Sequence, residues 1–330
     1  MKTIACLLTA LILVVLQQPA PATSEEKQAR PAREVVFPQD YSIGTVSLMV
    51  PSATTFGHIK SLSRTKALGP AQGKISVPAG TYLGLEGNAR FFSHCQALDK
   101  LKPDDIDRLT IRFSALADEE EKYFSTAIKK VSRLTGLREL LLTKSDISDK
   151  LLADINSLTN LQWLDCNLTA VDGSFMEHLQ QLKELRILRF SESSIDERNL
   201  KYLSNFPKLE MLELERCRIG SVGLSYIAKT CPNLINLELT GDTQVDDRAI
   251  EKIGNLKKLG FLSLGGTSVT TAGLIKLKGC TALKTVSLPK SNYSTSDLRD
   301  IKKSLPHATL FPTKRQAQDQ DNAVLFAPLH

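Results

Sequence analysis

Long apolar runs, basic runs and paired catalytic residues are all scarce in this chain of 330 residues. Beyond residue 22 no stretch is long and apolar enough to span a bilayer. The net charge of +6 is spread along the chain, with no basic run interleaved with aromatics, so we expect no nucleic-acid partner. No histidine recurs beside a fixed Ser or Cys, so we expect no enzyme; the five stand at His58, His94, His178, His307 and His330.

The first 22 residues have the composition of a secretory signal peptide. Lys2 supplies the positive charge, residues 5–16 form a short apolar segment, and residues 20–22 (Ala-Pro-Ala) offer small side chains for cleavage. An uncleaved N-terminal anchor is the alternative, although the apolar run is short for a membrane span. The sequence therefore predicts an exported protein, either periplasmic or extracellular, with no transmembrane segment after cleavage.

A repeat of 24 or 25 residues organises the chain from about Ile106 to Leu310. Two clear copies begin at Leu185 and Leu209, and both follow the pattern L-x-x-L-x-L, with Phe190 as the last apolar residue of the first. Self-similarity at a period in the twenties indicates a repeat architecture. The opening leucines are Leu137, Leu161, Leu185, Leu209, Leu234, Leu259 and Leu283.

The spacing within one copy predicts a short strand followed by a helix. Leu212 and Leu214 are two residues apart and therefore point to the same side of a strand. Leu224 and Ile227 are three apart, which suits one face of a helix. A single copy cannot bury its apolar side, so stacked copies must share one core. We expect an α/β solenoid whose parallel strands line the concave side, with one continuous line of core leucines, Leu188, Leu212, Leu237 and Leu262.

The strand motif resembles that of leucine-rich-repeat proteins over residues 106–310. Residues 219–224 (Ile-Gly-Ser-Val-Gly-Leu) and 230–234 (Thr-Cys-Pro-Asn-Leu) are similar to the cysteine-containing subclass. That subclass occurs in the substrate-recognition arms of F-box proteins and in secreted bacterial proteins, notably of planctomycetes. The secreted group often carries a segment like residues 71–80 and is the closer match, because no F-box helices are found and the leader indicates export. The resemblance implies a right-handed β/α horseshoe that binds other proteins and needs no cofactor.

The sequence divides into five segments. A small β-rich cap is expected ahead of the repeats, with a strand at residues 44–50 and two more around a turn at residues 78–80. Such a cap covers the otherwise exposed end of the shared core. Two copies, at residues 171–175 and 195–199, are looser than the rest, so the pattern does not fix the local geometry of their helices, although it still supports the array. The segments are signal peptide 1–22, flexible leader 23–34, cap 35–105, solenoid of about eight repeats 106–311 and disordered tail 312–330.

Five cysteines remain beyond the predicted signal peptide, and an odd number without close spacing argues against a disulfide framework. Cys166 takes a core position of its strand, and Cys217 follows its strand in the turn. Cys231 and Cys280 each stand three residues before an opening leucine. All four read as small apolar core residues. They belong to different layers, so no metal site is expected, and Cys95 precedes the repeats.

Side chains that alternate away from the core form rows on the expected concave face. One row is largely apolar and contains the only Trp, and the neighbouring rows are mostly acidic. Exposed apolar side chains on such a face mark contact surfaces. We therefore expect a protein or peptide partner with a basic rim and an apolar centre. The candidate site residues are Trp163, Asp165, Ile187, Arg189, Met211, Glu213, Glu215, Glu238 and Phe261.

Three other interpretations stay open. The apolar row could pack against itself or be covered by the terminal tail. The protein could be a structural component of an envelope or matrix. Asp165 and Glu213 could form a paired-carboxylate hydrolase site, but two strand spacings put them about 10 Å apart, which is wide for a glycosidase.

Overall fold

The computed structural model describes residues 30–56, 59–112, 118–289 and 293–311. The predicted signal peptide and the predicted C-terminal tail lie outside these ranges. Within them, no helix combines the length and the apolar character needed to cross a membrane.

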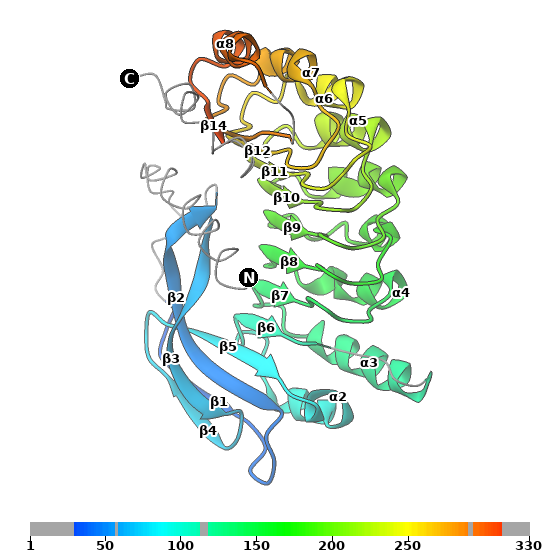
Figure 1. Cartoon of the computed structure of the whole chain (residues 1–330). Coiled ribbons are helices and arrows are strands. Elements are labelled where there is room, and N and C mark those ends of the chain that lie inside the picture. Colours follow the sequence, from blue (N-terminus) through cyan, green and yellow to red (C-terminus); the bar gives the residue numbers. More distant parts are fainter. Residues whose placement is uncertain (1–29, 57–58, 113–117, 290–292, 312–330) are drawn as a thin grey trace.

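A sheet of twelve strands runs through the molecule (Figure 1). From β6 onward the strands are parallel neighbours of three residues, one for each repeat. Their register sets Leu188, Leu212, Leu237 and Leu262 side by side, which confirms the expected leucine line. These strands are β6 (Arg108–Thr110), β7 (Glu139–Leu141), β8 (Trp163–Asp165), β9 (Ile187–Arg189), β10 (Met211–Glu213), β11 (Asn236–Glu238), β12 (Phe261–Ser263), β13 (Thr285–Ser287) and β14 (Thr309–Phe311).

Helical segments cover the opposite side of these strands (Figure 1). In the two copies that depart from the repeat pattern, the segments η4 and η5 are 3₁₀ helices. Gly173, at a φ of 88°, introduces the first of them. The segments are α3 (Asp118–Val131), α4 (Asp149–Leu152), η3 (Ala153–Ser157), η4 (Ser174–His178), η5 (Glu197–Asn205), α5 (Ser221–Thr230), α6 (Asp247–Ile253), α7 (Thr271–Ile275), η6 (Lys276–Gly279) and α8 (Thr295–Ser304).

One hydrophobic core connects the repeats. It extends from Val35 in the cap to Leu310 in the last strand, and the strand leucines within it are fully buried. No repeat could bury these side chains alone, because each layer's apolar residues are covered by those of the next. The fold is therefore an α/β leucine-rich-repeat solenoid with a β-rich N-terminal cap.

The cap contains two β-structures. Strands β1 (Arg33–Val36) and β4 (Lys74–Val77) form an antiparallel pair. Strands β2 (Gly44–Phe56) and β3 (Ile59–Pro70) form a long hairpin, and β5 (Tyr82–Gly87) joins it to the solenoid by pairing with β2 and β6. The short helices α2 (Arg90–Ser93) and η2 (Cys95–Lys100) follow. The cap thus continues the sheet of the repeats.

Two details differ from the sequence-based expectation. The turn at residues 78–80 exists, with Gly80 at a φ of 75°. The strands around it, however, do not pair with each other, because β4 joins β1 whereas β5 joins β2. The strand β3 was not expected, since Ile59–Pro70 is rich in Lys, Arg and Ser and lacks a clean apolar alternation.

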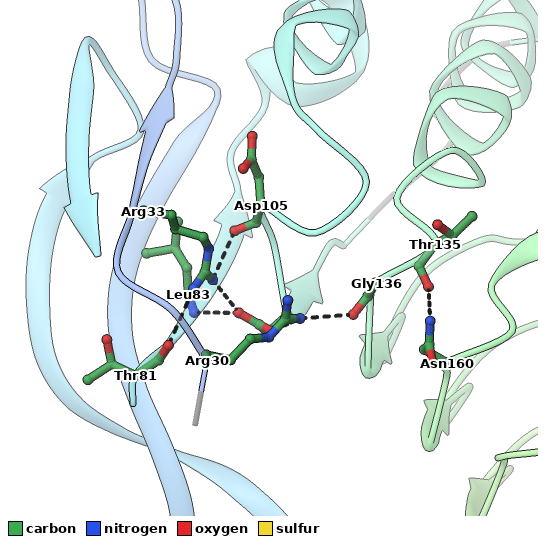
Figure 2. A network of polar contacts seen from close by, with 9 residues as sticks. Arg30, Arg33, Thr81, Leu83, Asp105, Thr135, Gly136 and Asn160 are labelled. Carbon is green, nitrogen blue, oxygen red and sulfur yellow. Dashed lines mark hydrogen bonds and ion pairs between the residues drawn. The ribbon is translucent and has the colours of Figure 1, made fainter. Parts of the chain in front are cut away.

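A buried ion cluster fastens the start of the chain to the first repeat (Figure 2). The Asp107 side chain is fully buried and accepts from Arg30, from Arg33 at 2.6 Å and from the Leu83 N–H at 2.9 Å. Burial raises the pKa of Asp107, and the two arginines oppose that rise. Arg33 also donates to the carbonyls of Thr81 and Asp105. Residues 30–34, expected to belong to a flexible leader, are therefore ordered by this cluster and by β1.

The turns after β7 to β12 each bury a small polar side chain, and we call these residues the polar column. Ser193 Oγ donates to the Cys166 carbonyl at 2.8 Å, and Cys217 Sγ donates to the Phe190 carbonyl at 3.0 Å. The next copy places a carboxyl group here: Asp242 is fully buried, and its Oδ1 accepts from the Ile219 N–H at 3.0 Å. The polar column comprises Ser145, Thr169, Ser193, Cys217, Asp242 and Thr267.

The cysteines lie inside the protein, as their repeat positions indicate. Cys166, Cys217, Cys231 and Cys280 are buried within the core, as is Cys95. None of these five is in a disulfide. Burial raises the pKa of the Cys217 and Cys231 thiols to about 12, so both are neutral and unreactive at physiological pH.

Carboxyl groups at the start of several helices also bond to the following repeat. Asp149 accepts from the Phe175 N–H at 3.1 Å, and Asp247 accepts from the Thr270 N–H at 2.8 Å. Glu197 Oε2 accepts from the N–H groups of Gly220 and Gly223, both at 2.9 Å. Each bond satisfies a backbone donor that the next loop leaves unpaired. We call these the inter-repeat caps.

Candidate binding surface on the concave face

The parallel register gathers the predicted site residues into two rows on the strand side of the solenoid, except for Glu215, which lies two residues beyond the end of β10. In the first row Trp163, Ile187 and Met211 are direct neighbours, and Asn236 separates them from Phe261. In the second row Asp165, Arg189, Glu213 and Glu238 are consecutive neighbours. The alternation of a strand therefore placed these side chains correctly relative to one another.

The apolar row is less exposed than expected. Ile187 is 1% exposed, Met211 3% and Phe261 4%, and only Trp163 is half-buried. Ile187 and Met211 form a small cluster with Trp163, separate from the main core. Packing across the row thus explains part of the apolar pattern, and a partner would meet Trp163 before the others.

Arg189 is the centre of the second row. Its guanidinium lies 3.5 Å from Asp165 Oδ2 and 2.5 Å from Glu213 Oε1, and it stands over the Trp163 ring at 5.1 Å from the centroid. Burial lowers the pKa of Arg189, but Glu213 and Asp165 together outweigh that effect and raise it. Because Arg189 stands between the two carboxylates, they are held as its ion-pair partners and do not face each other as a hydrolytic pair.

Among the described residues, no ion pair joins Glu215 or Glu238 to a basic side chain, unlike Glu213. Burial raises the pKa of Glu213, although the pairing with Arg189 opposes this. The pKa of Glu238 rises to about 9, first through burial and then through the charges of Glu213 and Glu215 and a hydrogen bond with Glu215. Asp165, Glu213, Glu215 and Glu238 together form what we call the acidic strip. Glu238 is protonated at neutral pH, which lowers the negative charge of this strip.

The hairpin reaches the concave face at its N-terminal end. Figure 1 shows β2 and β3 on the strand side of the solenoid, opposite the helices. The Leu62 N–H donates to Glu139 Oε1 at 2.8 Å, and Arg108 forms an ion pair with the same carboxyl group. Arg108 also stands over the Trp163 ring at 5.8 Å from the centroid. The hairpin thus occupies the layer of β7, and Trp163 borders the strip that begins beyond it.

Sequence reasoning placed Glu139 in the same outward row as Trp163 but missed Arg108 and Leu62 as neighbours of this surface. One signal was available: Arg108 and Glu139 have opposite charges at equivalent outward positions of adjacent copies. The contact with Leu62 had no such signal, because it joins residues 77 positions apart. Among the described residues, no group of three or more His, Cys, Asp or Glu side chains could hold a metal ion.

These rows belong to the strand side of a leucine-rich-repeat solenoid. No protein-family model matches the chain, and neither does any curated protein. The chain is similar to an internalin (inlF) from Listeria monocytogenes, with 20% identity and a TM-score of 0.48 over 68% of each chain. A leucine-rich-repeat protein from Leptospira interrogans is 19% identical, with a TM-score of 0.42 over 63% of this chain and 55% of that one. A chain of the yeast Rad7 and Elc1 complex is 16% identical, with a TM-score of 0.44 over 72% of each chain.

Proposed function

We propose that this protein is an exported, non-enzymatic scaffold that binds a protein or peptide partner on its concave strand face. The observation that carries the proposal is the strip formed by Trp163, Arg189 and the acidic groups beside them. Its members come from successive repeats in strict register. From Asp165 to Glu238 the strip spans three strand spacings, about 14 Å, which is close to the length of four extended residues.

The side chains that remain accessible support a polypeptide partner. Trp163, Arg189, Glu215 and Glu238 are all half-buried, so each keeps part of its surface accessible to a partner. Aromatic and guanidinium groups held in this way lose little conformational freedom on binding and dominate many interfaces. Within the described residues the acids here are either paired with Arg189 or placed beside another acid, so they present carboxyl oxygens to a partner along the strip.

Export and a bacterial origin among secreted proteins of the cysteine-containing subclass are part of the same proposal. The signal-peptide composition of residues 1–22 and the resemblance of the repeats support it. Fusing residues 1–33 to a reporter that is active only outside the cytoplasm tests export. We expect reporter activity that is lost when the fusion begins at residue 23. Equal activity of the two fusions would contradict the export part.

The binding part is tested by comparing Trp163→Ala with Tyr123→Ala. Tyr123 is 51% exposed on α3, on the helix side, and serves as the matched aromatic control. Both variants and the native protein are screened against one array of synthetic peptides. We expect Trp163→Ala to weaken binding about tenfold or more, as interface anchors do, and Tyr123→Ala to leave it unchanged. Equal behaviour of the two variants, with both folded, would contradict a binding site on the concave face.

A further inference from the structure

Glu215 and Glu238 are the two more accessible carboxyl groups of the acidic strip. Arg189 is bound to Asp165 and Glu213, on the other side of the strip. Glu215 and Glu238 are half-buried, whereas Glu213 is only 6% exposed. Ser263 on the adjacent strand β12 adds no charge. Among the described side chains of these rows, the two open carboxyl groups therefore face each other with Arg189 as the nearest base.

The structure brings these two carboxyl groups into contact even though like charges repel. Glu238 bonds to Glu215, and Glu213 and Glu215 both oppose its ionisation, with Arg189 favouring ionisation more weakly. The proton on Glu238 neutralises one of the two negative charges that the pair would otherwise carry. Two carboxyl groups sharing a proton in this way are arranged to receive a positive group.

A second and independent observation is an unpartnered hydroxyl group at the same place. Ser191 is 9% exposed, and within the described residues its Oγ has no hydrogen-bond partner. It lies two residues after Arg189, in the turn just beyond the end of β9. The neighbouring Glu192 N–H donates to the Glu215 carbonyl at 2.8 Å, which sets Ser191 beside Glu215.

We propose that Glu215 and Glu238, with Ser191 beside Glu215, receive an arginine or lysine side chain of the partner. This proposal rests on the proposed function and names the chemistry of its ligand. A guanidinium presents five N–H donors in one plane, and the three residues offer carboxyl and hydroxyl oxygens from three successive repeats. A metal ion suits them less well, because the described carboxyl groups do not converge closely enough to hold one.

Binding of a cation at this place must release a proton. The free protein holds Glu238 protonated up to a pKa of about 9. A guanidinium against Glu238 lowers that pKa, so the proton leaves as the cation enters. The affinity for an arginine peptide is therefore expected to increase as the pH rises from 7 toward about 9. Arginine stays charged throughout this range, so the change reports on the protein.

The experiment uses short synthetic peptides whose central residue is Arg, Lys, citrulline or Glu, in otherwise identical flanks. Citrulline keeps the shape of arginine and removes its charge. The full mature chain is compared with Glu215→Gln, Glu238→Gln and the control Asp300→Asn, which removes one exposed carboxylate on α8. We expect the native protein to prefer Arg over citrulline about tenfold or more. Either Gln substitution should reduce that preference to less than about threefold, and Asp300→Asn should retain it.

The outcomes separate this inference from the proposed function. Binding that depends on Trp163 but is equal for Arg and citrulline peptides would overturn the inference and leave the proposed function standing. An Arg preference that survives both Gln substitutions would also overturn it, because the cation would then bind elsewhere. A native protein that binds none of the peptides would count against both. The Gln variants should fold normally, since each removes a carboxyl group from a crowded acidic site, and thermal unfolding verifies this.

Discussion

Replacing Asp242 with Asn is expected to stabilise the solenoid above neutral pH and to change its stability little in acid. Burial raises the pKa of Asp242 from 3.8 to about 7 in the folded protein. Below about pH 4 the carboxyl group is protonated in both the folded and the unfolded chain, so its ionisation costs no stability. Between about pH 4 and 7 the unfolded chain loses its proton and the folded chain keeps it. The free energy of unfolding then falls by about 1.4 kcal/mol per pH unit.

Above pH 7 this loss levels off at a ceiling of about 4 kcal/mol, the product of the shift and that slope. Asn removes the cost, because it stays neutral. Its Oδ1 atom can accept from the Ile219 N–H as Asp242 does, at 3.0 Å in the present structure. Its amide group can donate to a backbone carbonyl, as Ser193 and Cys217 do at the same position of the polar column.

The assay is urea unfolding of the native protein and Asp242→Asn at about pH 4.5 and about pH 8, on either side of the transition. Glu213 and Glu238 also have raised pKa values, so the native protein alone will lose stability as the pH rises. Only the difference between the two proteins isolates Asp242. Asp300→Asn, an exposed position, serves as the control and should show no pH-dependent difference. A gain of the same size at both pH values, or a loss at about pH 8, would refute the reasoning.

Two further predictions concern packing and the cap. Asp107→Asn should destabilise the protein by about 3 kcal/mol, because the two arginines would lose their buried counter-charge, and limited proteolysis should then cleave faster near residues 30–36. An unchanged cleavage rate would show that the cluster does not hold the start of the chain. Gly279→Ala should cost about 1–3 kcal/mol in urea unfolding, because its Cβ would lie 2.3 Å from the Gly254 carbonyl oxygen. Gly260→Ala is the matched control, since its Cβ would meet nothing closer than 3.7 Å; equal losses in the two variants would contradict the steric argument.

The repeats could be predicted from sequence because their physics is local and repeated. One spacing of apolar residues, copied seven times, determines the strand, the turn and the line of core leucines. The copies around Val171 and Ile195, where the pattern did not fix the helix geometry, contain the 3₁₀ helices η4 and η5. The cap gave no such repetition. Strand β3 lacks a clear apolar pattern, so its pairing with β2 depends on the surrounding structure more than on its own residues.

The candidate surface was predictable in position but not in exposure. Register follows from the repeat, so the neighbours of Ile187 and Met211 could be named. Their burial could not, because it depends on how neighbouring side chains fill the face. The role of Arg189 was similarly hidden. Alternation placed it between Asp165 and Glu213, but only coordinates show that it bonds to both and leaves Glu215 and Glu238 without that partner.

The inter-repeat caps make the two ends of the array unequal, because each cap joins an acceptor of one repeat to a donor of the next. At Asp149, Glu197 and Asp247 the carboxyl group comes from the earlier repeat and the amides from the later one. A nascent chain that emerges with its N-terminus first therefore already carries the acceptor that each of these loops requires. Shortening the chain from its C-terminal end leaves these three caps intact in the repeats that remain, although a cut before Asp242 removes the acceptor of the Ile219 N–H. Removing the first repeats strips the capping carboxyl group from the loop at the cut. Fragments that begin at residue 30 and stop between repeats should consequently fold better than fragments of equal length that keep only the C-terminal end.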